Sequence, residues 1–361
     1  MEWTEEHKKF IKSVLKRFGN KLSPQHVSFL LKRHMEISPQ MAEVSSLLRE
    51  LQPENPKAEL AKIPLAERKR DLKGVCIDVL NEAKALLEKE GVHSVPKRTT
   101  ESGLSALLFL SDLHFGEVVV INGERVFDLK IAEQRLEAIV DNFIHSKELE
   151  GHHVDECILL LGGDMIDGEL IYPAQSFDTE GHAYEQIKET TLILWTQIMR
   201  LAKRFPVVRI YCVPGNHGRS SKLHHQMSNW DNVLYYGLQL MAVFHDQNIE
   251  VSTPLQMWMD FKVRNWSVHM RHIGVLQSIT AGPGRKVSNW LNEHDADLFF
   301  YGHFHCPEMF SIGYKRIFKN GALPPANDFA ESHGFLDSSG QWMIGITDSE
   351  SVAFAKILIP E

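Results

Sequence analysis

Five segments of the sequence place side chains of metal-binding types at the end of a short, largely apolar run. Such runs are typical of covered strands in α/β sheets, which bind ligands at the carboxyl ends of their strands. Carboxylate, imidazole and amide donors together suit manganese, iron or zinc, and the absence of cysteine from the set argues against a structural zinc cage. The five polar groups are, in chain order, Asp112-x-His114, Gly163-Asp164, Gly215-Asn216-His217, His272 and Gly302-His303-x-His305.

A single aspartate or histidine after a strand is more often a turn former or a cap. Five in ordered succession predict instead that these side chains meet at one rim of a sheet. Asp164 is the expected centre of the group, because a carboxylate at a strand end can bridge two cations. Two ions about 3.5 to 4 Å apart need a shared anion, and together they acidify water for hydrolysis.

The ordered series resembles the motifs of the calcineurin-like metallophosphoesterases over roughly residues 104 to 325. The resemblance implies an α/β fold, a two-sheet αββα sandwich, and a phosphoric ester hydrolase with two divalent ions. Manganese is expected ahead of iron, zinc or magnesium. The resemblance assigns one ion to Asp112, His114, Asp164 and His305, and the other to Asp164, Asn216, His272 and His303.

The resemblance also implies that His217 meets the scissile phosphate and donates a proton to the leaving oxygen. An acidic residue often follows this histidine in the family and orients it, whereas here the next residue is Gly218. The partner of His217 must therefore come from elsewhere in the chain.

Spacing sets further expectations. On extended backbone, residues two apart point to one side, which would align His303 with His305 and Asp112 with His114. The same rule puts His269 and His272 on opposite faces of a strand. We prefer His272 as the ligand, because it stands where the strand gives way to a loop, and we keep His269 as the alternative.

Cations near these motifs could clamp phosphate groups, especially beside the glycine-rich segment 281–284. The alternative is an ordinary solvated loop. These cations are Arg219, Lys222, Arg285 and Lys286. Four other polar residues are expected behind the ligands or at the surface, without a direct role: Asp167, Glu169, His224 and His225.

Two regions differ in charge. Residues 1–100 contain 19 Lys and Arg against 14 Asp and Glu, a balance of +5, and the remainder contains 20 against 33, a balance of −13. Residues 1–98 have helical periodicity and Ser-Pro helix starts, which predicts a basic all-helical module, in one interpretation a helix-turn-helix, with a linker near 91–103. The alternative is a helical cap on the catalytic domain, expected over residues 104–361.

Within the catalytic domain, strands are expected to alternate with helical segments, among them 131–144 and 184–203, as in βαβ units. Short strands are expected after His305, at 310–312, 316–318, 343–347 and 353–359. Turns are expected at Asn320-Gly321 and Ser339-Gly340.

Composition indicates where in the cell the protein is expected to be. The four cysteines form no C-x-x-C pair, which is typical of reduced residues in an intracellular protein. The sequence has no run of 18 apolar residues and its N-terminus has no signal-peptide core, so we expect a cytoplasmic protein without a membrane partner. A homodimer remains an open alternative.

The motifs also bear on the substrate. Protein phosphatases of this superfamily carry Gly-Asp-x-x-Asp-Arg-Gly and Gly-Asn-His-Glu, and both patterns break here, at Gly168 and Gly218. The sequence is more similar to the DNA-repair nuclease and phage-encoded phosphoesterase branch, so a DNA or RNA nuclease is expected. One alternative is a phosphodiesterase or phosphatase acting on a small or cyclic nucleotide. Another is an inactive binding scaffold, which the complete set of ligands argues against.

Overall fold

The computed structural model describes residues 103–169, 178–220, 225–245, 248–253, 255–272, 291–325 and 339–360, and scattered positions elsewhere (3–5, 7–9, 11–12, 31, 43–44, 47, 171 and 175). The chain divides into two compact units, one of residues 1–71 and 172–174 and the other of residues 72–171 and 175–361. In the first unit, the described residues between positions 5 and 47 are helical. Four of them are buried: Ile11, Leu31, Val44 and Leu47. The rest of the predicted module, and the linker up to residue 102, lie outside the described residues.

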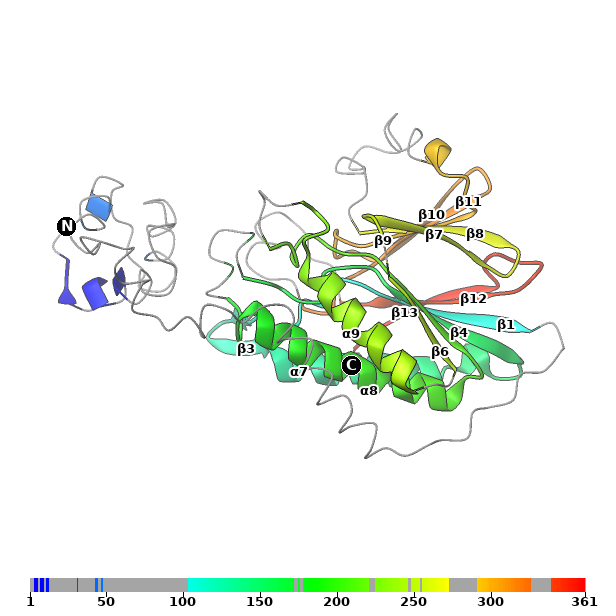
Figure 1. Cartoon of the computed structure of the whole chain (residues 1–361), viewed down its shortest axis with the longest axis horizontal. Coiled ribbons are helices and arrows are strands. Elements are labelled where there is room, and N and C mark those ends of the chain that lie inside the picture. The colour runs from blue at the N-terminus through cyan, green and yellow to red at the C-terminus, as the bar shows by residue number, and fades with distance from the viewer. Residues whose placement is uncertain are drawn as a thin grey trace. The chain divides into compact units, whose positions relative to one another are not determined.

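Six strands form the first sheet of the second unit, in the order β13-β12-β1-β4-β5-β6 (Figure 1). β1, β4, β5 and β6 are parallel to one another. β12 lies antiparallel beside β1, and β13 lies antiparallel beside β12. Their bounds are β1 Leu104–Leu110, β4 Val154–Leu161, β5 Val208–Cys212, β6 Ile249–Ser252, β12 Gln341–Ile346 and β13 Phe354–Leu358.

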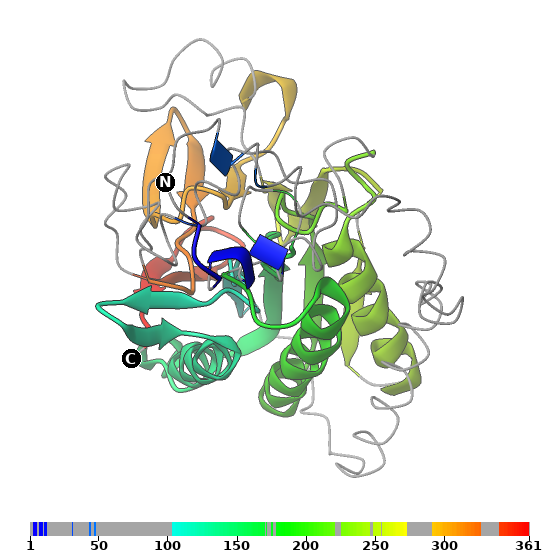
Figure 2. The same ribbon diagram turned by 90° about the vertical axis from the view of Figure 1, so that its left-hand side faces the viewer.

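Three helices connect the parallel strands of this sheet: α7 (Leu129–Ile144), α8 (Ala183–Arg204) and α9 (Trp230–His245). The first two confirm the helices predicted over 131–144 and 184–203. The side chain of Asp128 caps α7 by accepting from the Ile131 backbone N–H at 2.9 Å, which satisfies one of the free donors of the first turn. Figure 2 shows α7 in teal beside α8 in green.

A second, five-stranded sheet has the order β10-β11-β9-β8-β7. Within it β8 and β9 are parallel, as are β9 and β11, and the two outer pairs are antiparallel. The bounds are β7 Trp258–Val263, β8 Trp266–Arg271, β9 Leu298–Tyr301, β10 Glu308–Ile312 and β11 Lys315–Lys319. A separate hairpin is formed by β2 (Val119–Ile121) and β3 (Glu124–Phe127).

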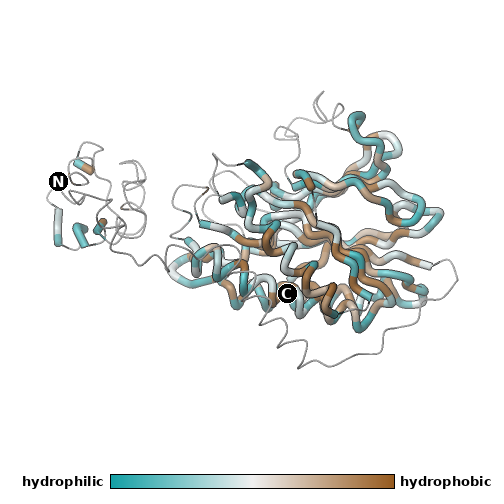
Figure 3. Tube along the Cα trace, in the orientation of Figure 1, coloured by the Kyte–Doolittle hydropathy of each residue, from teal (hydrophilic) through white to brown (hydrophobic). Residues whose placement is uncertain are grey.

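The two sheets pack face to face. Phe109 of β1 meets Phe300 of β9 edge to face, with ring centroids 5.3 Å apart, in a core that contains residues of both sheets. The larger core lies between the first sheet and its helices, with Trp195 of α8 fully buried in it. Hydrophobic residues run along the strands and the inner sides of the helices (Figure 3). The fold is thus α/β with two mixed sheets, as an αββα sandwich requires.

This layering positions the polar segments. Because β1, β4 and β5 are parallel neighbours, and β8 and β9 are parallel neighbours in the opposing sheet, the carboxyl ends of these strands can converge on one rim. Among the described residues, no helix combines the length and apolarity needed to span a bilayer.

Candidate active site

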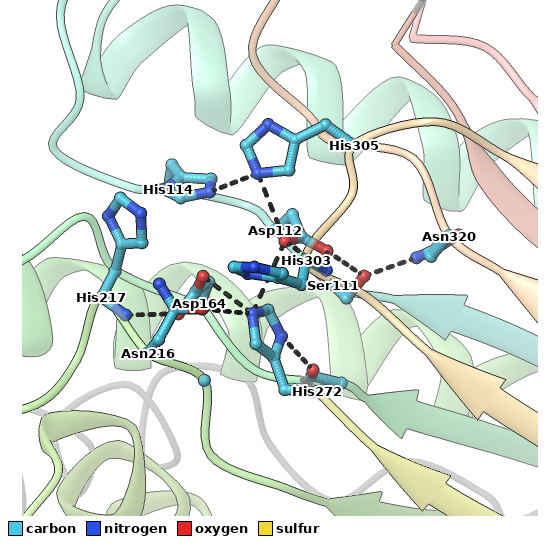
Figure 4. A network of polar contacts seen from close by, with 12 residues as sticks. Ser111, Asp112, His114, Asp164, Asn216, His217, His272, His303, His305 and Asn320 are labelled. Atoms are coloured by element: carbon cyan, nitrogen blue, oxygen red, sulfur yellow. Dashed lines mark hydrogen bonds and ion pairs between the residues drawn. The ribbon is translucent and has the colours of Figure 1, made fainter. Parts of the chain in front are cut away.

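Eight predicted site residues come together in the loops after β1, β4, β5, β8 and β9, with their side chains pointing toward one another (Figure 4). Potential ligand atoms fall into groups in which all atoms lie within 4.8 Å of one another. Two of these groups are Asp112, His114, His305 and Asp164, His272, His303.

In the first group, two imidazole nitrogens face each other. His114 Nε2 lies 3.1 Å from His305 Nε2, which in turn lies 3.3 Å from Asp112 Oδ1. A proton or a cation must lie between the two nitrogens, because both would otherwise present lone pairs. Asp112 and His114 are buried, whereas the His305 side chain is 37% exposed, so this group is open on the His305 side.

In the second group, a histidine lone pair faces oxygen atoms. His272 Nδ1 donates to the Gly162 carbonyl at 2.8 Å, which fixes the tautomer and leaves Nε2 toward Asp164 Oδ2 at 2.9 Å and Asn216 Oδ1 at 3.1 Å. Burial lowers the pKa of His272, but the charges of Asp164 and Asp112 outweigh it and raise the pKa to about 9. The site therefore demands positive charge at this point, from a proton or from an ion.

Asp164 connects the two groups. Its Oδ1 accepts from the His217 backbone N–H at 2.7 Å, whereas its buried Oδ2 faces His272 Nε2 at 2.9 Å without the geometry of a hydrogen bond. Burial raises the pKa of this carboxyl, but His272 and His217 hold it well below its usual range. A buried carboxylate oxygen without a hydrogen bond is costly unless a cation meets it, so these residues fit a pair of divalent ions.

Five site residues have left-handed backbone, with φ of 53° at Asp112, 46° at His114, 53° at Asp164, 79° at His303 and 57° at His305. The prediction that extended backbone aligns each pair of residues two apart is therefore wrong. The pairs converge because the chain turns sharply after the strands end. Such angles cost of order 1 kcal/mol each in residues with a Cβ and are typical of functional sites.

The partner of His217 is Asp167. His217 Nδ1 lies 2.9 Å from Asp167 Oδ1, and the same oxygen lies 3.3 Å from His114 Nδ1. Burial lowers the pKa of His217, but Asp164 and Asp167 outweigh it and raise the pKa to about 10. Because Nδ1 is engaged, Nε2 is the atom through which the ring can exchange a proton.

Gly218 explains why the orienting acid is not the next residue. A Cβ built at Gly218 would lie 2.4 Å from Asn229 Oδ1, so no side chain fits there. Asn229 itself is held by its contact with the Gly215 carbonyl, to which Nδ2 donates at 2.7 Å.

A buried polar network lies behind Asp112 (Figure 4). Ser111 Oγ donates to Asp112 Oδ2 at 2.5 Å and accepts from Asn320 Nδ2 at 3.0 Å. Gln341 Oε1 accepts from both the Ser111 N–H and Asn320 Nδ2. The sequence indicated only a turn at Asn320-Gly321, and no local pattern marked Gln341. Partners of this kind orient a ligand and tune its affinity for a metal.

Asp231, in the first turn of α9, is a second residue that the sequence did not reveal. Its carboxylate accepts from the backbone N–H groups of Asp164 at 3.0 Å, Met165 at 3.2 Å and Gly215 at 2.8 Å. Burial and the charge of Asp164 raise the pKa of Asp231 to about 6. One side chain thus joins the loop after β4 to the loop after β5.

The structure brings His272 to this group and sends His269 elsewhere. His269 is fully buried within β8, and its Nδ1 lies 2.6 Å from Asp260 Oδ1 on the neighbouring strand β7. Burial lowers the pKa of His269 to about 4, so its ring is neutral at neutral pH.

Only one of the predicted phosphate clamps lies within the described residues. Arg219 Nε donates to the Asn216 carbonyl at 3.1 Å, which holds the guanidinium beside the site. The other three clamps, Lys222, Arg285 and Lys286, lie outside the described residues, as does His224. Glu169 is half-buried and His225 is exposed.

The chain matches one protein family and is similar to several solved structures. The sequence model of the calcineurin-like phosphoesterases matches residues 106–307. Among solved structures, zinc-complexed Vps29 from Entamoeba histolytica is 14% identical, with 70% of this chain and 96% of that chain covered and a TM-score of 0.34. A predicted phosphoesterase from Streptococcus pneumoniae is 14% identical (71% and 98% covered, TM-score 0.30), and an archaeal phosphodiesterase is 11% identical (70% and 99% covered, TM-score 0.34).

A comparison with curated protein sequences gives no match. The family match nevertheless spans more than half of the chain and contains all five motifs in full. The chain therefore belongs to the calcineurin-like phosphoesterase family, as a metal-dependent phosphoesterase.

Proposed function

We propose that the protein is a phosphodiesterase that cleaves nucleic acid strands with two divalent metal ions. The observation that carries the proposal is the position of Asp164, whose carboxylate belongs to one potential ligand group with His114 and His217 and to another with His272 and His303. A carboxylate shared in this way is what a pair of cations requires.

In this proposal the two ions divide the ligands as the family resemblance implies. Asp112, His114 and His305 would hold one ion, and His272, His303 and the amide oxygen of Asn216 would hold the other, with Asp164 shared by both. When bound, the two ions offset phosphate charge and lower the pKa of water, and manganese is the ion that we expect. The mixed imidazole, carboxylate and amide donors support this choice over magnesium, which prefers oxygen ligands.

The chain's own residues supply the proton chemistry. His217 is held through Nδ1 by Asp167, and its ring packs edge to face against His114 with centroids 4.4 Å apart. We therefore assign Nε2 of His217 as the donor of the proton that the leaving oxygen takes up. Arg219, fixed on the Asn216 carbonyl, offers a cation to the phosphate beside it.

The choice of a nucleic acid substrate rests on charge and on motif. The first 100 residues carry a balance of +5, which supports docking of a polyanion, and the two phosphatase motifs are broken at Gly168 and Gly218. The balance of −13 in the remaining residues favours a second candidate, hydrolysis of a small nucleotide that does not extend over the surface.

A substrate panel separates these candidates. The full chain, supplied with manganese, is given labelled single-stranded and double-stranded oligonucleotides, cyclic nucleotides and bis-p-nitrophenyl phosphate. Asp112→Ala is the blank, and Asp141→Ala, on the surface of α7, is the matched control. We expect metal-dependent cleavage of oligonucleotides that is lost only in the blank.

Two outcomes contradict the proposal. Turnover of cyclic nucleotides with intact oligonucleotides establishes the small-nucleotide reading. If no phosphodiester in the panel is hydrolysed and fewer than two ions bind per chain, the protein is the inactive scaffold.

A further inference from the structure

A second cluster of potential metal ligands lies on the outer face of the second sheet. Val268 and Met270 of β8 point into the core between the sheets, so His269 between them points to the other face. There it lies beside Phe299 of β9, with ring centroids 5.7 Å apart, in a satellite cluster separate from the inter-sheet core. His272, three residues further on, belongs instead to the catalytic rim.

Two residues from other elements meet His269 on this face. Asp260 is its directly opposite partner on β7, and His294 follows the helical residues 291–293. The two carboxylate oxygens of Asp260 are divided between the rings, with Oδ1 at 2.6 Å from His269 Nδ1 and Oδ2 at 3.8 Å from His294 Nδ1. The two imidazole rings lie 3.8 Å apart at an angle of 34°.

We propose that Asp260, His269 and His294 bind a third divalent ion of the zinc class, independent of the catalytic pair. Two imidazoles and one carboxylate are donors that zinc accepts, and the ligand atoms all lie within 4.8 Å of one another. Zinc bonds place neighbouring ligand atoms roughly 3.3 Å apart in a tetrahedron. That value lies between the 2.6 and 3.8 Å of the two carboxylate–imidazole pairs.

The surroundings suit an ion that enters from solvent. The Asp260 side chain is 55% exposed and that of His294 is 18% exposed, whereas His269 is fully buried. A fourth ligand position on the Asp260 side is therefore open to water.

Lys315 holds the segment that carries His294. Lys315 Nζ donates to the carbonyls of Leu291 at 2.7 Å and His294 at 3.1 Å, and the Arg271 guanidinium lies 6.0 Å from the centre of the Trp258 ring. The ion would tie residues 291–294 to strands β7 and β8, which is a structural role and not a catalytic one.

Zinc titration of the metal-free full chain tests this site, with bound ion counted by mass spectrometry and thermal stability measured alongside. We expect one zinc-binding site that persists in Asp164→Asn, where the catalytic pair is impaired. In His294→Gln and in Asp260→Asn the affinity of this site should fall at least tenfold, while manganese-dependent hydrolysis is unchanged. His152→Gln, which alters an exposed histidine, is the matched control.

Folding is checked by the melting temperature of each variant without metal, which should match that of the parent chain. Cobalt(II) offers a second readout, because a site with two imidazoles and a carboxylate gives visible absorption that His294→Gln should remove from the Asp164→Asn background. If zinc stoichiometry and the zinc-induced rise in melting temperature are the same in His294→Gln, Asp260→Asn and the parent chain, the proposal is overturned.

Discussion

Replacing Asp167 with asparagine tests the acid role of His217 directly. Asp167 Oδ1 lies 2.9 Å from His217 Nδ1, and its charge is one of the causes that raise the pKa of that histidine to about 10. A hydrogen bond to a charged group contributes about 1.5 to 3 kcal/mol, and 1.36 kcal/mol corresponds to one pKa unit. Asp167→Asn should therefore lower the pKa of His217 by about one to two units.

The sign of the effect on activity follows. His217 donates its proton only below its pKa, so activity falls as pH rises through that value, and the variant should lose activity at a lower pH than the parent. Bound divalent ions repel the His217 imidazolium, so they lower its pKa in the parent chain and in the variant alike. The displacement between the two pH profiles is therefore the quantity to compare.

Two substrates distinguish proton donation from a general loss of structure. A nitrophenolate leaves without a proton, whereas the alkoxide of a sugar needs one. Asp167→Asn should therefore cost about 100-fold in kcat on an oligonucleotide and much less on bis-p-nitrophenyl phosphate. Saturating manganese is used because Asp167 also contacts His114.

Asp155→Asn is the matched control, because Asp155 pairs with His153 at the other end of β4. Equal losses on both substrates, with an unmoved alkaline limb of the pH profile, would refute the reasoning.

Three further substitutions probe the residues behind the site. Asp231→Ala leaves three buried N–H groups without their acceptor and should lower the free energy of unfolding by about 3 kcal/mol or more, as measured with urea. Gly218→Asp puts a Cβ 2.4 Å from Asn229 Oδ1 and should lower both the melting temperature and the activity, although it restores the family's acidic position. Ser111→Ala removes the 2.5 Å hydrogen bond to Asp112 and should raise the manganese concentration for half-maximal activity about tenfold, with kcat nearly kept.

Much of the site was predictable because its signals are local. An apolar run of strand length followed by a metal-binding side chain can be read within ten residues, and the strands ending before Asp112, Asp164 and His303 have this form. The alternation of β8 likewise separated His272 from His269. Helices α7 and α8 followed from their periodicity. Residues of the later strands, near 310, 317, 344 and 356, were also placed correctly.

The residues that the sequence did not reveal act through distant backbone groups. Asp231 accepts from N–H groups 66 and 67 residues away, and Gln341 accepts from Ser111, 230 residues away. Neither has a neighbouring residue that marks its role. Helix α9 was missed because the segment from Trp230 to His245 is apolar on most sides and lacks a clear polar face. Strands β6 and β7 were missed as well.

The orienting acid was missed for a different reason. The pattern Gly163-Asp164-x-x-Asp167 was compared with the phosphatase motif only to reject it, since the next residue is Gly168. The structure shows that the second aspartate of that pattern reaches His217 on its own.

The left-handed backbone at the ligands has a consequence for how the protein can evolve. The residues concerned are Asp112, His114, Asp164, His303 and His305. Glycine adopts such angles without the steric cost that a Cβ brings, so the ligand side chains are kept there against a conformational cost. A descendant freed from catalysis would gain stability by exchanging these side chains for glycine. Decay of the enzyme should therefore begin at its ligands, as a gain in stability, before it reaches the strands that carry them.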